Sequence, residues 1–278
     1  MAVPHEQVRI GQHSASEVLW GIVPESPIHL VVNGETRTVL MATPDHLDDL
    51  ARGVLHTELG LQASTQPISI AVDSAMGEYR VEVTLADDDA ARLRARGQSL
   101  MANSACGLCG VEALADLASR TPSSARVSPH QVSDEAILAA FESLTAQQPL
   151  HAATHSAHAA AWCTASGDIV LVREDVGRHN ALDKLIGALL NHGMPADGFL
   201  IMSSRCSYEL IHKAAHTPAR LLATWSAPTT MALEWSRHIK LPVMSVARDA
   251  TRQTQVVHFA SAISSNIGHH ESTGHHVG

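Results

Sequence analysis

Two cysteines three positions apart, Cys106 and Cys109, are the residues whose type and spacing most directly suggest chemistry. They stand in the stretch C-G-L-C-G, and the chain holds only four cysteines in 278 residues. A thiol pair of this spacing can be half of a metal site, a redox pair or a sulfur nucleophile. The flanking glycines favour a mobile loop, and the N-terminus of the helix expected next favours a thiolate at Cys109. An activated thiol on such a loop suits a carrier that meets two partners in turn.

Other interpretations of the pair stay open at this point. Zinc normally takes four ligands, so the pair supplies half a site, and His151, His155 and His158 are candidates for the other half. A thioredoxin-like motif would follow a strand, and the preceding L-R-A-R-G-Q-S-L-M-A-N-S-A is not a convincing strand. Two buried structural cysteines fit a glycine-rich stretch poorly. We expect reactive thiols and no metal site.

Composition narrows the class of protein. The formal net charge is −9, which gives no basic excess for binding nucleic acid. No apolar run approaches the roughly 18 residues of a membrane helix, and the first residues show no signal-peptide pattern. Four cysteines in a chain of this length are no disulfide framework. These features predict a cytoplasmic protein with no membrane or nucleic-acid partner.

The first part of the chain predicts a small α+β domain. Residues 27–43 read as a hairpin because two β-rich runs flank Asn33-Gly34, a strong turn signal. Residues 45–60 have helical apolar spacing, and residues 67–74 and 78–85 resemble strands. The Pro- and Ser-rich stretch 121–129 indicates a linker. We place one domain at 1–125, which carries the thiol loop, and a second at 126–278.

In the second domain, the expected strands and helices alternate as they do in an α/β sheet. A helix is expected from Pro129 to Leu144. Strands are then expected at 168–172, 198–202, 220–225 and 241–247, with helices at 181–190, 208–215 and 231–237 between them. This alternation predicts a largely parallel sheet covered by helices. The last residues, 267–278, are rich in His and Gly and are expected to be disordered.

Polar residues follow each of these strands. Ligands in open α/β sheets bind outside the carboxyl ends of the strands, and helix N-termini there favour anions. The loops therefore predict a pocket for a phosphorylated or otherwise anionic ligand, with candidate residues Arg173, Glu174, Asp175, Arg178, His179, Asn180, Ser203, Ser204, Arg205, Ser226, Thr229, Thr230, Arg248 and Arg252.

Several long motifs, in order, carry a family resemblance. R-E-D-V-G-R-H-N-A-L-D-K-L-I-G (173–187) is very similar to the signature of the formate dehydrogenase accessory sulfurtransferases, the FdhD/NarQ family. C-G-L-C-G (106–110) resembles the cysteine motif of that family. M-A-T-P-D-H-L-D-D-L-A (41–51), S-Y-E-L-I-H-K-A-A (207–215) and S-A-P-T-T-M-A-L-E (226–234) also match in order. The similarity spans about residues 24 to 258.

The resemblance implies a fold and a function. The fold is α/β, with a cytidine-deaminase-like C-terminal domain and a smaller α+β N-terminal domain. The function is a sulfurtransferase that moves persulfide sulfur from a cysteine desulfurase to the bis(molybdopterin guanine dinucleotide) form of the molybdenum cofactor, which formate dehydrogenase then receives. GDP would mimic the nucleotide part, and a homodimer is expected. The alternative is a non-catalytic chaperone that holds this cofactor, with a structural or zinc-binding C-x-x-C.

The resemblance also implies residue roles. Cys106 matches the persulfide carrier and Cys109 the second cysteine. The stretch 246–251 falls where the family binds the cofactor. The predicted cofactor-binding residues are Val246, Ala247, Arg248, Asp249, Ala250, Thr251, Asp175, Arg178, His179, Asn180 and Arg205. Asp183 and Lys184 are expected to serve structure. The chain departs from the family pattern at His155, Ser156, Ser204 and Cys206.

Further expectations concern a possible deaminase motif, two tryptophans and the other two cysteines. Cytidine deamination requires H-x-E and P-C-x-x-C, whereas Ala160 stands two residues after His158 and Ala105 precedes Cys106. Trp225 and Trp235 fit core packing better than a stacking platform. Cys163 reads as a buried residue at a strand edge, and Cys206 as an extra thiol beside the pocket.

Overall fold

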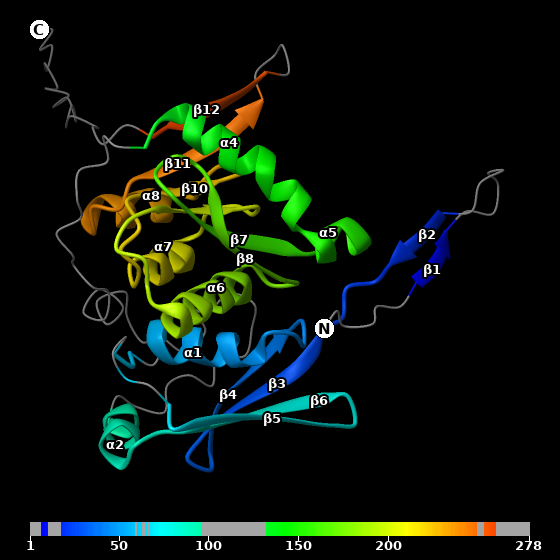
Figure 1. Cartoon of the computed structure of the whole chain (residues 1–278), viewed down its shortest axis with the longest axis vertical. Coiled ribbons are helices and arrows are strands. Elements are labelled where there is room, and N and C mark those ends of the chain that lie inside the picture. Colours follow the sequence, from blue (N-terminus) through cyan, green and yellow to red (C-terminus); the bar gives the residue numbers. More distant parts are fainter. Residues whose placement is uncertain are drawn as a thin grey trace, which may run out of the picture.

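The computed structural model describes residues 7–10, 18–58, 60–62, 65, 67–95, 132–248 and 253–259. This part of the chain forms a six-stranded sheet, a four-stranded sheet and a two-stranded hairpin, together with several helices (Figure 1). The predicted α/β class is confirmed. The domain boundary predicted between residues 125 and 126 lies outside the described residues and stays a prediction.

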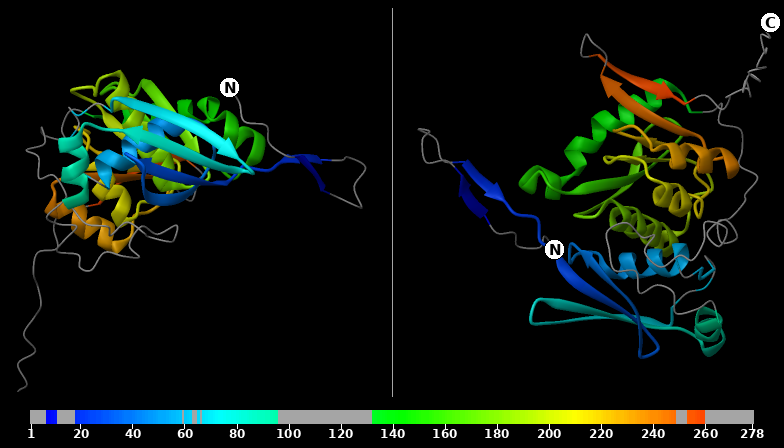
Figure 2. Two further views of the ribbon diagram at one scale, coloured as in Figure 1. Left: turned by 90° about the horizontal axis from the view of Figure 1, so that it is seen from below. Right: turned by 180° about the vertical axis from the view of Figure 1, so that it is seen from behind.

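The smaller region is a four-stranded sheet with a helix on one face. Its elements are β3 (Ser26–Val32), β4 (Glu35–Ala42), α1 (Leu47–Thr57), β5 (Ser69–Ala75), β6 (Glu78–Thr84) and α2 (Asp87–Ala95). The predicted hairpin is confirmed: Asn33 and Gly34 connect β3 and β4 with φ angles of 47° and 81°, the left-handed conformation that an Asn-Gly turn adopts. Alternate residues of β3 and β6, among them Ile28, Leu30 and Val81, pack against α1. The hairpin of β1 (Gln7–Ile10) and β2 (Val18–Gly21) projects from the body (Figure 2).

The larger region contains the six-stranded sheet, in the order β12-β11-β10-β9-β7-β8. Its elements are α4 (Asp134–Leu144), the short 3-10 turn η2 (Thr145–Gln147), α5 (Pro149–Thr154), β7 (His158–Cys163), β8 (Ile169–Asp175), α6 (Arg178–His192), β9 (Phe199–Met202), α7 (Tyr208–Ala214), β10 (Leu222–Thr224), α8 (Thr230–His238), β11 (Val243–Arg248) and β12 (Thr254–His258).

The sheet is mixed, which corrects the prediction of a largely parallel sheet. Strands β9, β10 and β11 are parallel, but β7 runs antiparallel to both β8 and β9, and β12 runs antiparallel to β11. The reason is the length of the connections, because β7–β8 and β11–β12 are each joined by only a few residues, too few for a crossover to a parallel strand. Strands β8, β9, β10 and β11 nevertheless share one direction.

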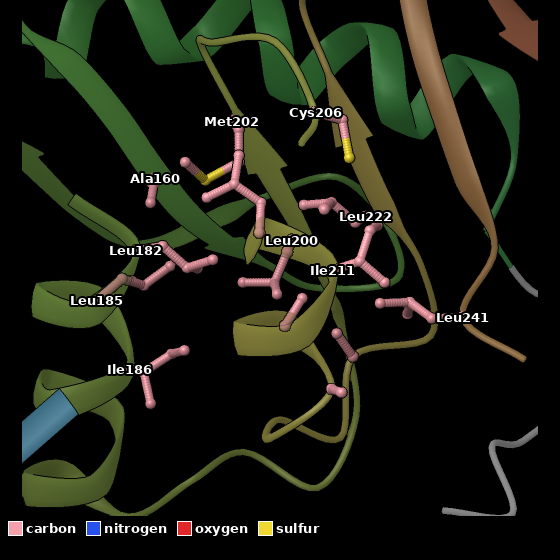
Figure 3. Close-up of a cluster of buried hydrophobic side chains, with 14 of the residues drawn as sticks. Ala160, Leu182, Leu185, Ile186, Leu200, Met202, Cys206, Ile211, Leu222 and Leu241 are labelled. Carbon is pink, nitrogen blue, oxygen red and sulfur yellow. The ribbon is translucent and has the colours of Figure 1, made fainter. Parts of the chain in front are cut away.

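Helices cover both faces of this sheet. On one face α4 packs Ile137, Ala140 and Phe141 against the strands. Ser133 fixes the start of α4, since its Oγ accepts a hydrogen bond from the backbone N–H of Ala136 at 3.2 Å. On the other face α6, α7 and α8 enclose the larger core, part of which is drawn in Figure 3.

The two regions meet where α1 lies along α6 (Figures 1 and 2). The helices touch backbone to backbone at two glycines. A Cβ atom on Gly53 would lie 1.9 Å from the carbonyl oxygen of Asp183, and one on Gly187 would lie 1.8 Å from that of Asp49. No larger residue fits at this distance, so the glycines set the approach of the two helices.

Candidate functional site

The carboxyl ends of β8, β9, β10 and β11 lie along one edge of the six-stranded sheet, here called the carboxyl edge. The first residue of β7, His158, lies at the same edge because β7 is antiparallel, and it pairs with Asp175 at the end of β8. The loop after β9 is anchored beside them, since Ser203 Oγ accepts from the N–H of Ala159 at 2.8 Å. The predicted convergence of strand ends therefore occurs in the fold.

The motif predicted as a polar loop over 173–180 is mostly regular structure. Only Val176 and Gly177 stand between β8 and α6. Arg173 donates from Nε to the carboxylate of Asp49 on α1 at 2.8 Å. The carboxylate of Glu174 accepts hydrogen bonds from the backbone N–H groups of Leu150 and His151, both at 2.8 Å. These two charges hold neighbouring elements in place and do not form part of an open loop.

Asp175 and Asn180 were predicted to bind the cofactor, but their polar groups are occupied by the chain itself. Asp175 is fully buried and accepts from Thr43 N at 3.0 Å and Lys184 Nζ at 2.8 Å. Asn180 Nδ2 donates to Asp175 at 3.1 Å and to the carbonyl of Met41 at 2.8 Å. The two side chains hold the turn that leads into α6. Their role in the structure is therefore to position this turn. Lys184, which was expected to serve structure, is fully buried.

Three arginines of the carboxyl edge have no acidic partner among the described residues. They are Arg178 at the start of α6, Arg205 after β9 and Arg248 at the end of β11. Arginines elsewhere, such as Arg80 and Arg173, contact a carboxylate. The Nε atom of Arg178 is buried and lacks a hydrogen-bond partner within the described part of the chain. In a chain of net charge −9, cations along one edge of the sheet that lack an acidic partner among the described residues favour an anionic ligand.

His158 lies within the electrostatic influence of two of these cations, Arg178 and Arg205. Burial lowers its pKa, and the charges of Arg178, His151 and Arg205 lower it further. The imidazole is therefore neutral at pH 7, and a neutral ring can accept a hydrogen bond at one nitrogen and donate one at the other.

His179 lies one residue further along α6 and faces the start of α7. Its Nε2 lies 3.4 Å from Ser207 Oγ and 3.8 Å from Glu209 Oε2. Burial opposes ionisation of Glu209, but hydrogen bonds with His179 and Ser207 outweigh it and lower the pKa of Glu209 to about 2. The carboxylate is thus charged at neutral pH and orients the imidazole at the carboxyl edge.

A cavity of about 600 Å³ opens beside β10 and β11. It has the size of a small-molecule site. Its walls come from the loop after β10, the end of β11 and the returning strand β12, and the lining residues are Trp225, Ser226, Ala227, Ser245, Val246, Ala247, Arg248, Thr254, Val257 and Phe259. The predicted cofactor-binding residues Val246, Ala247 and Arg248 are thus among the lining residues, while Asp249, Ala250 and Thr251 lie outside the described residues.

Trp225 corrects another prediction, because it was expected to pack in the core. The side chain is 42% exposed and lines the cavity. The arginines were predicted as site residues because they follow the carboxyl ends of strands. The same rule applies to Trp225, which is the first residue after β10. Sequence reasoning passed over it because a tryptophan is more often buried than functional.

The four cysteines fall into two groups. Cys163 and Cys206 are both 0% exposed, and burial raises the pKa of each thiol to about 12. The burial predicted for Cys163 is confirmed. Cys206, expected as an extra thiol beside the pocket, is buried in the same core cluster as Met202 and Leu222 (Figure 3). Cys106 and Cys109 lie outside the described residues, so the structure leaves their predicted roles as predictions.

Within the described ranges, no three His, Cys, Asp or Glu side chains gather closely enough to hold a metal ion. His151 and His155 do meet, with ring centroids 5.8 Å apart. No helix in the described residues is both long and apolar enough to cross a bilayer.

Known proteins share both the fold and the sequence. A crystal structure of a candidate formate dehydrogenase accessory protein from Desulfotalea psychrophila superposes with a TM-score of 0.65, covering 91% of this chain and 95% of the other at 16% identity. This likeness shows the fold alone.

Closer relatives are named sulfur carrier protein FdhD. The protein of that name from Chromobacterium violaceum is 43% identical over 82% of this chain and 85% of its own length. The one from Xanthomonas euvesicatoria pv. vesicatoria is 40% identical over 82% of this chain and 81% of its own. Residues 23–263 match the FdhD/NarQ family as a whole. The predicted resemblance is therefore confirmed, and the chain belongs to the FdhD/NarQ family.

Proposed function

We propose that this protein is a sulfurtransferase that receives persulfide sulfur from a cysteine desulfurase and delivers it to the bis(molybdopterin guanine dinucleotide) molybdenum cofactor for formate dehydrogenase. The names of its relatives support the sulfur-carrier part. The structural observation that supports the rest is the row of arginines along the carboxyl edge that lack an acidic partner within the described residues, one of which, Arg248, lines a cavity of about 600 Å³. Such a site suits a large anionic substrate with several phosphates.

The carrier thiol is assigned to Cys106. The thiolate of Cys106 attacks the outer sulfur of the donor persulfide, a new S–S bond forms, and the donor cysteine leaves as a thiolate. A thiol with a pKa of about 12 is ionised to only ~10⁻⁵ at pH 7, so the buried Cys163 and Cys206 are unsuited to this attack. Their burial leaves Cys106 and Cys109 for the chemistry, with Cys109 as the assisting thiol.

The anionic substrate is assigned to the carboxyl edge. Guanidinium groups pair well with phosphate oxygens, and Arg178, Arg205 and Arg248 are the candidates to meet the two diphosphate groups of the substrate. Val246 and Ala247 line the cavity beside Arg248, and GDP serves as a mimic of one half of the substrate. His179, oriented by Glu209, is the candidate for moving a proton as sulfur leaves the persulfide.

The proposed partners follow from this chemistry. A cysteine desulfurase supplies the persulfide, and the catalytic subunit of formate dehydrogenase receives the sulfurated cofactor. We expect the protein to act in the cytoplasm as a homodimer.

Restoration of formate dehydrogenase activity in cells that lack their own carrier tests the proposal. Cys106→Ala is expected to abolish activation, whereas Cys206→Ala, a matched change at a buried thiol, is expected to retain it. Full activation by Cys106→Ala would contradict the assignment. Zinc analysis of the purified protein separates the alternative, because bound zinc together with full activity of the thiol variant indicates a cofactor chaperone.

A further inference from the structure

The cavity at the carboxyl edge has an unusual share of the aromatic residues. Only 3% of the chain is aromatic, with four tryptophans, three phenylalanines and two tyrosines. Two of these, Trp225 and Phe259, line this one cavity together with Arg248. An exposed aromatic ring and a guanidinium in the lining of one cavity provide a surface for a planar ring that carries negative charge.

Trp225 is held in a fixed position although its ring is exposed. Its backbone N–H donates to the carbonyl of Met202 at 3.0 Å. The carbonyl of the next residue, Ser226, accepts from Thr224 Oγ1 at 2.7 Å and from Ser245 Oγ at 3.0 Å. These bonds fix the loop after β10 to the neighbouring strands.

A second contact restrains the indole itself. The buried ring of Phe141 on α4 lies behind it, with ring centroids 5.5 Å apart and planes inclined by 58°. Such a tilted contact suits aromatic pairs and limits the rotation of the indole. A rigid ring loses little entropy when a ligand stacks on it, so the arrangement is prepared for binding.

We propose that Trp225 is the stacking wall for a purine base, and that Arg248 contacts the phosphate attached to the same nucleotide. The inference rests on the proposed function and identifies the guanine ring as the group that the cavity holds. Every base has a π-face, and the larger purine ring overlaps more of the indole than a pyrimidine does. Trp225 therefore contributes affinity for the base, separately from the arginines that contact phosphate.

Calorimetric titration with GDP, UDP and inorganic pyrophosphate tests this assignment. The wild-type protein is expected to bind GDP more tightly than UDP, and UDP more tightly than pyrophosphate. Trp225→Ala should raise the Kd for GDP about tenfold, the loss of one stacked base, and leave the Kd for pyrophosphate unchanged. Trp225→Phe should restore part of the GDP affinity. Met231→Ala changes a side chain of similar exposure, 41%, outside the cavity, and should bind GDP as the wild type does.

The outcomes separate this inference from the function on which it rests. Equal GDP affinity in Trp225→Ala and the wild type overturns the stacking role, and a loss of GDP binding in Arg205→Ala then still supports the phosphate site. Equal losses of GDP and pyrophosphate affinity in Trp225→Ala also overturn it, because they indicate a collapsed cavity. If the wild type binds no GDP, both the stacking role and the proposed substrate fail. Persulfide loading of Cys106 should be unchanged in Trp225→Ala.

Discussion

The α1–α6 interface and the carboxyl edge differ in whether their charged side chains are paired with opposite charges in the described residues. At the interface, Lys213 contacts Asp183 at 2.9 Å and also contacts Glu58. Burial opposes the charge on Lys213, but the two carboxylates outweigh it and raise its pKa. At the carboxyl edge, Arg178 and Arg205 have no acidic partner within the described residues. Paired buried charges indicate a scaffold, whereas cations without an acidic partner in the described residues are suited to an anionic ligand.

The greatest loss of stability is expected at Lys184, which lies on α6 and joins the end of β8 to the segment that precedes α1. Lys184 is fully buried, and its Nζ lies 2.8 Å from Asp175 and 2.6 Å from Asp45. Lys184→Met should lower the free energy of unfolding by about 3–5 kcal/mol, because it leaves the buried carboxylate of Asp175 without a counter-ion. Urea denaturation measures the change. A loss under 1 kcal/mol would show that this ion pair does not act as a scaffold.

A smaller loss is expected from crowding the α1–α6 interface. Gly187→Ala places a methyl group against the backbone of Asp49, so the helices must separate. The expected loss is about 1–3 kcal/mol, measured by thermal or urea denaturation. Asn191→Ala, on the exposed end of the same helix, is the control and should leave stability unchanged. Equal stability of the two variants would contradict the close packing of α1 on α6.

The interface should also make stability depend on pH. Burial and the nearby charge of His212 lower the pKa of His216 to about 3, whereas an unfolded histidine has a pKa of about 6.5. Between these values the unfolded chain binds the extra proton, so this group makes stability fall as pH falls, by at most about 1.4 kcal/mol per pH unit. Denaturation at pH 7 and pH 5 should show a shallower dependence for His216→Gln. Parallel pH profiles would mean that His216 titrates normally.

The smallest effect on stability is expected at the carboxyl edge. Arg205 is exposed and has no acidic partner in the described part of the chain, so Arg205→Ala should change the free energy of unfolding by no more than about 0.5 kcal/mol. GDP binding should nevertheless weaken by about 1–3 kcal/mol, the loss of one charge-assisted hydrogen bond. Calorimetry and denaturation on the same variant measure both. Normal GDP affinity, or a stability loss like that of Lys184→Met, would remove the contrast between the two regions.

Local pattern made much of this arrangement predictable. The Asn33-Gly34 turn indicated its hairpin, and the alternation of strands and helices placed Arg178, Arg205 and Arg248 at one edge. Contacts between distant segments were not predictable, because Asp175 meets Thr43 across 132 positions of sequence. Because such contacts could not be predicted, Asp175 and Asn180 were assigned to the site, although in the fold other segments of the chain enclose them. Trp225 was wrongly predicted to pack in the core, because the general tendency of tryptophan to be buried does not depend on which end of a strand it occupies.

We propose that sulfur travels on the thiol pair and not on the cysteines of the core. Incubation with a cysteine desulfurase and cysteine, followed by peptide mass spectrometry under non-reducing conditions, tests it most directly. We expect one added sulfur atom on the peptide that contains Cys106, and none on the peptides that contain Cys163 or Cys206, because burial keeps those two thiols un-ionised. Added sulfur on Cys163 or Cys206, or no added sulfur at Cys106, would contradict it.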